Sequence, residues 1–481
     1  MKNTLELQQV IYNVFKTQIQ FGTYRFEERL PTIEEAAPLF QTSVKTIRTV
    51  YQQLAQDGYL TISKSIGVKV SVQYTDEDIE AYIQRFFAER EIALLDLSQS
   101  LRPLLSNAQW LGFKNLSSAL LDKIEQFTIP REGLTPYIMI QQLQIVYGAL
   151  GNDLLMRLVW QTFMFFLLPF LSVSGNLKSL YTESNPLLEM TSLSRQQNWP
   201  ALHCSVEKFQ GQKACALHNF YANRILLPPS EQQIVFEWSS YKKTSQIYYS
   251  LGMALLVAIV QGIYPPGSLL PSLDALAQEK QVSLNTVRRT FALLNNIGAA
   301  KSINGVGTQV LPAELIGEYC DLSQPTVRER LLDFTKSLHL LSLSCRQVAE
   351  ITISSMNESA VENLEEQLKT CFQSQQQELV AYVIINQLSK DAPYATIRTI
   401  YTELFQQLFW GYPLQSMEQN PHHHLSFYLP YFDLFLDCLE RSDAAGFSIN
   451  LEKVMKHEIE FTIGQLIKLG IDDAAALVLD R

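Results

Sequence analysis

The sequence predicts a mainly α-helical protein in which one unit, three helices followed by a β-hairpin, occurs twice, each copy preceding an all-helical segment. Residues 30–48 read LPTIEEAAPLFQTSVKTIR and residues 270–288 read LPSLDALAQEKQVSLNTVR, so the two stretches match at a shift of 240 residues. The surrounding glycines recur at the same shift: Gly22 with Gly262, Gly58 with Gly298 and Gly67 with Gly307. A repeat of this length indicates a tandem duplication of domains, because solenoid repeats have periods of up to about 50 residues.

The three helices of the first copy follow from apolar spacing and helix-breaking residues. Apolar residues from Leu7 to Ile19 recur at helical spacing, and Gly22 ends that helix. We expect Pro31 to open the second helix, since its missing N–H does no harm at a first helical position. Ser43 is a natural cap for the third helix, which Asp57-Gly58 ends.

A hairpin is expected after each third helix. Residues 59–62 and 69–72 alternate like two strands around a turn that contains Gly67. The second copy repeats the scheme, with breaks at Gly262 and Pro265-Pro266-Gly267, a cap at Ser283, and Gly305 and Gly307 in the hairpin turn.

The segments between the hairpins are helical in pattern and also resemble each other. At a shift of 245 residues, 137–143 (YIMIQQL) faces 382–388 (YVIINQL), and Glu207-Lys208 faces Glu452-Lys453. Residues 226–243 contain Pro228-Pro229 and form a plausible junction. We therefore expect four domains, at 1–75, 76–235, 236–313 and 314–481.

Charge and composition favour an intracellular protein with local basic regions. The net charge of the 481 residues is −10, but residues 1–75 carry +2 and residues 240–313 carry +4, and local charge governs attraction to phosphate. The six cysteines are scattered without a CxxC pair, which fits reduced cytosolic thiols. The amino terminus lacks a signal-peptide profile, and the apolar stretch 158–171 is shorter than the ~20 residues of a membrane span. We expect a cytoplasmic protein without membrane contact.

Two short helices in a tight turn followed by a hairpin form a winged helix-turn-helix, whose third helix can enter a DNA major groove. The combined pattern of LP, Ala, Ser-x-x-Thr, Arg and the hairpin glycines resembles the GntR family of bacterial transcription regulators. The resemblance implies a winged helix that binds double-stranded operator DNA and a helical domain that binds a small-molecule effector and dimerises. Residues 439–445 (LERSDAA) are similar to a piece of the family's organic-acid-sensing branch.

The sequence departs from the family pattern at the same positions in both copies. Where the family usually has an arginine four residues after the leucine of its LP motif, this chain has Glu34 and Asp274. Where it usually has an arginine after the capping serine, this chain has Val44 and Leu284. An acidic side chain facing phosphate repels it, so we expect weak, salt-sensitive binding.

The remaining polar residues of the third helix and the wing are the candidate DNA contacts. Arginine and asparagine can read base edges, while serine, threonine and lysine mostly hold phosphates. The candidates are Ser43, Lys45, Thr46, Arg48, Lys64, Ser283, Asn285, Thr286, Arg288, Arg289 and Lys301. For the two central arginines, the competing interpretation is a helix-surface salt bridge.

The favoured function is a transcription regulator that acts through two non-identical winged helices on a bipartite operator, as a homodimer or as an internal pseudo-dimer. The alternative is a protein-interaction scaffold or a metabolite sensor with degenerate, non-DNA-binding winged helices. Plasmid replication initiators also carry paired winged helices, but they tend to be more basic and lack this signature. We predict no enzyme, no cofactor and no metal: the run His422–His424 is expected in a loop, and the aromatic stretch at 160–170 is interpreted as core and, less favourably, as a pocket lining.

Overall fold

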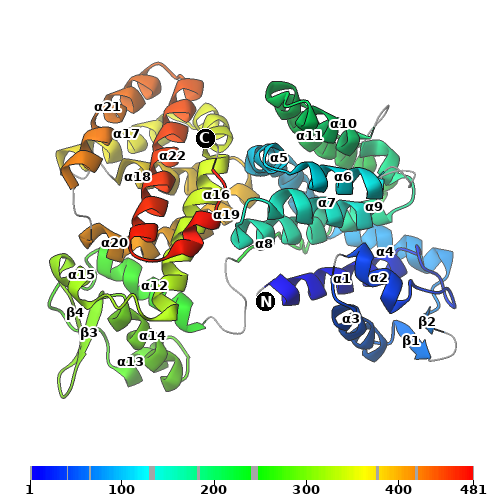
Figure 1. The fold of residues 1–481 in the computed structure, drawn as a ribbon, viewed down its shortest axis with the longest axis horizontal. Coiled ribbons are helices and arrows are strands. Elements are labelled where there is room, and N and C mark those ends of the chain that lie inside the picture. The colour runs from blue at the N-terminus through cyan, green and yellow to red at the C-terminus, as the bar shows by residue number, and fades with distance from the viewer. Residues whose placement is uncertain are drawn as a thin grey trace. The chain divides into compact units, whose positions relative to one another are not determined.

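The structure, a computed structural model, describes residues 3–40, 42–63, 67–128, 136–180, 185–239, 247–374, 379–417 and 421–479. The chain divides into two compact units. The first comprises Met1–Glu237 with Tyr394–Thr396 and Val478–Arg481, and the second comprises Trp238–Pro393 and Ile397–Leu477. Each unit begins with a winged helix-turn-helix and continues as a bundle of helices (Figure 1).

From the second helix to the hairpin, the elements of the two winged helices agree residue for residue at the shift of 240, and the first helices end at corresponding residues. The first contains α1 (Asn3–Gln20), α2 (Ile33–Leu39), α3 (Val44–Gln56), β1 (Leu60–Ser63) and β2 (Gly67–Val70). The second contains α12 (Ile247–Val260), α13 (Leu273–Glu279), α14 (Leu284–Asn296), β3 (Ala300–Ile303) and β4 (Gly307–Val310). The predicted fold class is therefore confirmed, including its duplication.

Helix caps fix where the short helices begin. Ser43 and Ser283 cap α3 and α14, each accepting a hydrogen bond from the backbone N–H three residues later. The expectation that Pro31 opens the second helix is wrong by two residues, because Thr32 forms a capping box with Glu35 and α2 begins after it. Ser272 caps α13 at the equivalent position.

Each wing is a two-stranded antiparallel hairpin anchored by the segment before the second helix. Leu60 pairs with Val70 in the first wing, and Ala300 pairs with Val310 in the second. The second strand begins at Gly67, two residues earlier than predicted from alternation. The backbone N–H of Leu30 donates to the Val68 carbonyl, at 3.1 Å, so a third segment extends the hairpin.

The helical part of the first unit begins with α4 (Asp76–Ala88), α5 (Glu91–Lys114), α6 (Ser118–Thr128) and α7 (Pro136–Gly148). It continues with α8 (Asp153–Thr162), η1 (Phe163–Leu167), α9 (Leu168–Ser172), η2 (Asn176–Leu180), α10 (Pro186–Arg195) and α11 (Trp199–Arg224). The long helices α5 and α11 pack against each other at its centre.

The helical part of the second unit opens with η3 (Ala313–Leu315), α15 (Ile316–Tyr319), α16 (Pro325–Ser355), α17 (Glu358–Gln373) and α18 (Val380–Asp391). It continues with α19 (Ala395–Leu408), η5 (Phe409–Gly411), α20 (Tyr412–Ser416), α21 (Pro421–Glu440), α22 (Ala444–Lys468) and η6 (Asp472–Ala476). Helices α16 and α22 form the central pair here. His422–His424 lie within α21, so the loop predicted for them is wrong.

The turn before the last long helix is the same in both helical parts. Gln197 and Ser442, which correspond at the shift of 245, both have φ of 54°. The next residue caps the helix in each case, Asn198 for α11 and Asp443 for α22. Since a positive φ is uncommon for residues other than glycine, a shared one at the same place supports duplication of the whole unit.

The most apolar helical stretch, Asp153–Ser172, is longer than the sequence suggested because turns continue through the π-helical segment η1 that precedes Pro169. It is the one helix among the described residues long and apolar enough to cross a membrane by length and composition, and 78% of its apolar window is buried inside the protein. Burial of Phe163, Phe166 and Phe170 favours the core interpretation over a pocket lining.

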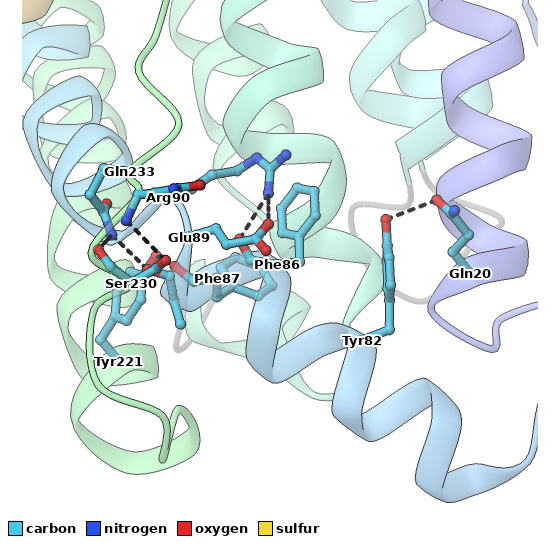
Figure 2. Close-up of polar contacts among 11 residues, drawn as sticks. Gln20, Tyr82, Phe86, Phe87, Glu89, Arg90, Tyr221, Ser230 and Gln233 are labelled. Atoms are coloured by element: carbon cyan, nitrogen blue, oxygen red, sulfur yellow. Dashed lines mark hydrogen bonds and ion pairs between the residues drawn. The ribbon is translucent and has the colours of Figure 1, made fainter.

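Helix α4 connects the first winged helix to the helical part of the first unit and is held at its middle and at its carboxyl end (Figure 2). Tyr82 donates a hydrogen bond to Gln20 Oε1 of α1, at 3.1 Å. At the carboxyl end, Tyr221 donates to the Phe87 carbonyl at 3.0 Å, and Gln233 Nε2 donates to the Ala88 carbonyl at 2.8 Å. The last carbonyls of a helix lack the regular intrahelical donor, and these side chains bond to them together with the backbone N–H groups of Arg90 and Ser230.

Candidate nucleic-acid interface

The third helix of each winged helix presents one exposed face and packs its other face into the core. On α3 the buried residues include Ile47, Val50, Tyr51 and Leu54. Its exposed residues are Val44, Lys45, Arg48, Thr49, Gln52 and Gln53. The exposed residues at the corresponding positions of α14 are Leu284, Asn285, Arg288, Arg289 and Ala292. An exposed helix face of this length fits the major groove of DNA.

The two central arginines have no charged or hydrogen-bonding partner among the described residues. Arg48 and Arg288 are both exposed, and neither forms an ion pair or a side-chain hydrogen bond within the part of the chain that the structure describes. The described residues therefore provide no acidic partner for the salt bridge that the competing interpretation requires. Lys45 and Asn285, one turn earlier, are exposed on the same side of their helices.

The other cations of the second module are partly committed to aromatic rings. The Arg289 guanidinium lies 3.9 Å from the ring centroid of Tyr248 on α12. Lys301 Nζ on the wing strand lies 4.5 Å from the ring centroid of Tyr319 and donates to its hydroxyl at 3.2 Å. Cation–π contacts at exposed sites contribute roughly 0.5–1 kcal/mol, which DNA contacts can exceed. Lys64, the wing candidate of the first module, lies outside the described residues.

The serine and threonine candidates form hydrogen bonds with each other at the start of the third helix of each module. Ser43 and Thr46 share a hydrogen bond between their hydroxyls at 2.9 Å, and Ser283 and Thr286 share one at 2.8 Å. Thr46 is only 3% exposed, so its side chain does not lie on the outer face, while Thr286 is half-buried.

The acidic residues that replace family arginines stabilise the second helices. Glu34 and Asp274 lie in the first turns of α2 and α13, where the positive end of the helix dipole favours a carboxylate. Both are exposed. A carboxylate in this place strengthens the helix and weakens any nearby phosphate contact.

In the first unit, the winged helix is joined to its helical domain by a buried polar and aromatic contact. Tyr24 and Tyr137 are connected through their hydroxyls at 3.0 Å, and Tyr137 also donates to Gln18 Oε1 at 2.8 Å. Gln141 Nε2 donates to the Leu39 carbonyl at the end of α2, at 2.8 Å. A movement of α7 would therefore also displace α2, the helix that packs against α3.

The core of the first helical domain contains a polar cluster that sequence reasoning missed. Lys213 on α11 is 4% exposed, and its Nζ donates to Gln210 Oε1 at 2.8 Å. Gln210 in turn donates to Gln109 Oε1 on α5 at 2.6 Å. The position equivalent to Lys213 in the second unit is Glu458, also 4% exposed, whose carboxylate accepts a hydrogen bond from Tyr428.

Among the described residues, no three or more His, Cys, Asp or Glu side chains form a group that could hold a metal ion. All six cysteines are free, and Cys345, Cys371 and Cys438 are buried.

Comparison with known proteins identifies the repeated module. The family described as bacterial regulatory proteins, gntR family, matches twice, at residues 7–70 and 247–310. A relative, an uncharacterized HTH-type transcriptional regulator YhcF of Bacillus subtilis (strain 168), is 26% identical over 113 residues, covering 23% of this chain and 91% of that protein.

Solved structures of similar proteins cover about half of the chain. Escherichia coli McbR/YncC is 16% identical, with a TM-score of 0.26, over 47% of this chain and 99% of that one. A GntR family member from Pseudomonas syringae pv. tomato str. DC3000 is 16% identical, with a TM-score of 0.21, over 46% of this chain and 88% of that one. The two family matches coincide with the two winged helices described above. The chain therefore carries two winged helix-turn-helix modules of the gntR family of bacterial regulatory proteins.

Proposed function

We propose that both winged helices bind double-stranded DNA and that the chain recognises a bipartite operator whose two half-sites differ in sequence. The observation that carries this proposal is the pair of unengaged arginines, Arg48 and Arg288, at the same place on the exposed faces of α3 and α14. Arginine in this position can form two hydrogen bonds to a guanine edge. The neighbouring exposed residues differ between the copies, which favours different half-sites.

Binding should be weak and sensitive to salt. Few cations lie on the exposed helix faces, and Glu34 and Asp274 add negative charge close to the expected phosphate path. Each lost phosphate contact lowers the salt dependence of log K by about 0.9 for duplex DNA. We therefore expect the affinity to fall as the salt concentration rises, with a smaller slope than that of a strongly basic regulator.

The test is genome-wide selection of bound fragments by the full chain, followed by quantitative gel shifts with Arg48→Ala and Arg288→Ala. Each substitution should weaken binding by about 1–3 kcal/mol and relax base preference in one half-site alone. Arg441→Ala, which removes a 73%-exposed arginine that follows α21 and pairs with Asp437, is the charge-matched control and should leave binding unchanged. Wild-type protein that shifts no fragment at low salt would overturn the proposal in favour of a scaffold or a sensor.

The two modules should not contribute equally. Residues 240–313 carry the higher local charge, and Arg288 is followed by Arg289. We therefore expect Arg288→Ala to weaken binding more than Arg48→Ala. Equal losses, or a greater loss for Arg48→Ala, would overturn this ranking.

We also propose that a small-molecule effector bound in a helical domain controls DNA binding. The contacts from Tyr137 and Gln141 of α7 to the first winged helix support this, since a ligand that shifts α7 would bias the position of α2. A metabolite that stabilises the protein against heat and changes its DNA affinity would support this regulation. Sedimentation of the DNA complex separates one chain per operator, an internal pseudo-dimer, from two.

A further inference from the structure

We propose that Val44 and Leu284 read the 5-methyl groups of thymines in the major groove and so determine part of the base preference of each module. The inference rests on the proposed function, because these residues reach bases only when α3 and α14 enter the groove. Val44 and Leu284 would then contribute to base specificity at two positions where the family usually has an arginine.

Both residues are apolar, exposed and placed at the very start of the helix. Val44 is 40% exposed and Leu284 is 38% exposed. Each directly follows the capping serine, which leaves the cap function to Ser43 and Ser283. Recognition helices contact base edges with residues near their amino-terminal ends, and these two side chains lie there.

On the exposed faces of α3 and α14, the first apolar residue and the arginine four positions later are shared, while the other exposed residues differ. The remaining exposed positions differ between the copies: Lys45 against Asn285, Thr49 against Arg289, and Gln52 against Ala292. A branched apolar residue followed four positions later by arginine is retained in both copies. A function common to both modules accounts for a pattern common to both.

Thymine is the base whose recognition suits such a residue. The 5-methyl group of thymine is the apolar group that the base pairs display in the major groove, and apolar side chains contact it. A valine or leucine without hydrogen-bonding atoms, placed over guanine or cytosine instead, would desolvate donors and acceptors without replacing their partners. The side chains therefore favour a thymine and disfavour the other bases.

The spacing predicts where that thymine lies. Residues four apart on a helix are neighbours, with Cβ atoms about 5–6 Å apart. Successive bases rise by about 3.4 Å along each strand. The thymine read by Val44 should therefore lie one or two base steps from the guanine read by Arg48, and the same relation should hold for Leu284 and Arg288.

The test removes the methyl group from the DNA and the apolar side chain from the protein. In a fragment that the full chain binds, each thymine is replaced in turn by deoxyuridine, which lacks only the 5-methyl group. We expect one sensitive position in each half-site, with affinity falling about 3–5-fold, as for one apolar carbon group removed from contact. Val44→Ser should lower affinity for the thymine fragment by a similar factor and abolish sensitivity at one half-site, and Leu284→Ser should do so at the other.

Control variants distinguish a loss of thymine recognition from a loss of folding, and the possible outcomes distinguish failure of this inference from failure of the proposed function. Ile467→Ser removes an apolar side chain of matched exposure, 42%, from the last turn of α22 and should leave both the affinity and the deoxyuridine pattern unchanged. Val44→Thr keeps one methyl group and should retain part of the sensitivity, while thermal unfolding verifies that each variant is folded. DNA binding with no sensitive thymine, or with the same sensitivity in the serine variants, overturns the inference and leaves the proposed function standing. Absence of any DNA binding overturns both.

Discussion

Lys213 is a buried lysine whose burial should lower the free energy of unfolding of the first unit at neutral pH. Its ammonium group is buried between α11 and α5, with Gln210 Oε1 as a hydrogen-bond acceptor at 2.8 Å and the Phe209 ring centroid at 4.6 Å from Nζ. Burial lowers the pKa of Lys213 from 10.5 to about 7. No carboxylate of the described residues forms an ion pair with it to offset the loss of hydration.

The sign of the pH dependence follows from where the proton is bound. The unfolded chain keeps the Lys213 proton up to about pH 10.5, whereas the folded chain releases it near pH 7. Between these values the unfolded state binds more protons, so the free energy of unfolding rises with pH through this window. Below the folded pKa the full penalty applies, and the gap corresponds to roughly 4–5 kcal/mol as an upper bound.

Replacing Lys213 with methionine, which has a similar length and no charge, should remove this penalty. We expect the free energy of unfolding of the first unit at pH 7 to rise by about 2–4 kcal/mol, reduced by about 1 kcal/mol because Gln210 loses a donor. The increase in stability between pH 7 and pH 10 should disappear in the variant.

The assay is hydrogen exchange of the α11 amides in the full chain at several pH values, because it reports on the first unit alone. Lys208→Met, at an exposed lysine of the same helix, is the control and should leave the pH dependence unchanged. If Lys213→Met destabilises the first unit at pH 7, or if its stability still rises between pH 7 and pH 10, the assignment of a buried, penalised lysine is wrong.

Three further substitutions test packing differences between the winged helices. Gly58 and Gly298 correspond and have φ of 82° and 75°, but an added Cβ meets nothing within 4 Å at Gly58 and lies 2.5 Å from the Ile316 carbonyl oxygen at Gly298. Gly58→Ala should therefore cost about 1–2 kcal/mol from backbone strain alone, while Gly298→Ala should cost clearly more, measured by urea unfolding; equal costs would refute the predicted clash. Tyr51 donates to the Pro31 carbonyl at 2.7 Å, and Phe291 at the same place in the second copy lacks the hydroxyl. Tyr51→Phe should destabilise the first module by about 0.5–1.5 kcal/mol, and no loss would mean that this hydrogen bond is replaced by water.

The sequence was sufficient to predict the winged helices because their signals are local. Ser43 and Ser283 cap helices, and Gly58 and Gly67 adopt positive φ, for reasons contained in a few neighbouring residues. The start of α2 was misplaced because Pro31 and Thr32 both carry helix-start signals, and the capping box formed by Thr32 with Glu35 prevails.

Features that depend on long-range contacts could not be predicted. Lys213 and Gln210 lie three residues apart on a helix, a spacing typical of an exposed polar face, and only the packing of α5 against α11 buries them. The stacking of Arg289 on Tyr248 joins residues of two helices whose proximity requires the fold. Arg48 and Arg288 were predicted from the sequence as DNA contacts, but their lack of a partner among the described residues became visible only in three dimensions.

The opposite charges at Lys213 and Glu458 also affect how the chain assembles. Two similar domains in one polypeptide are prone to exchange equivalent helices while they fold. If α22 took the place of α11, Glu458 would take the buried position of Lys213, without the Tyr428 hydroxyl that it has in its own unit. A buried carboxylate without a partner costs several kcal/mol, so we expect each unit to be more stable with its own last long helix than with the corresponding helix of the other unit. The difference between these two core residues would thus also disfavour mispairing of the duplicated halves during folding.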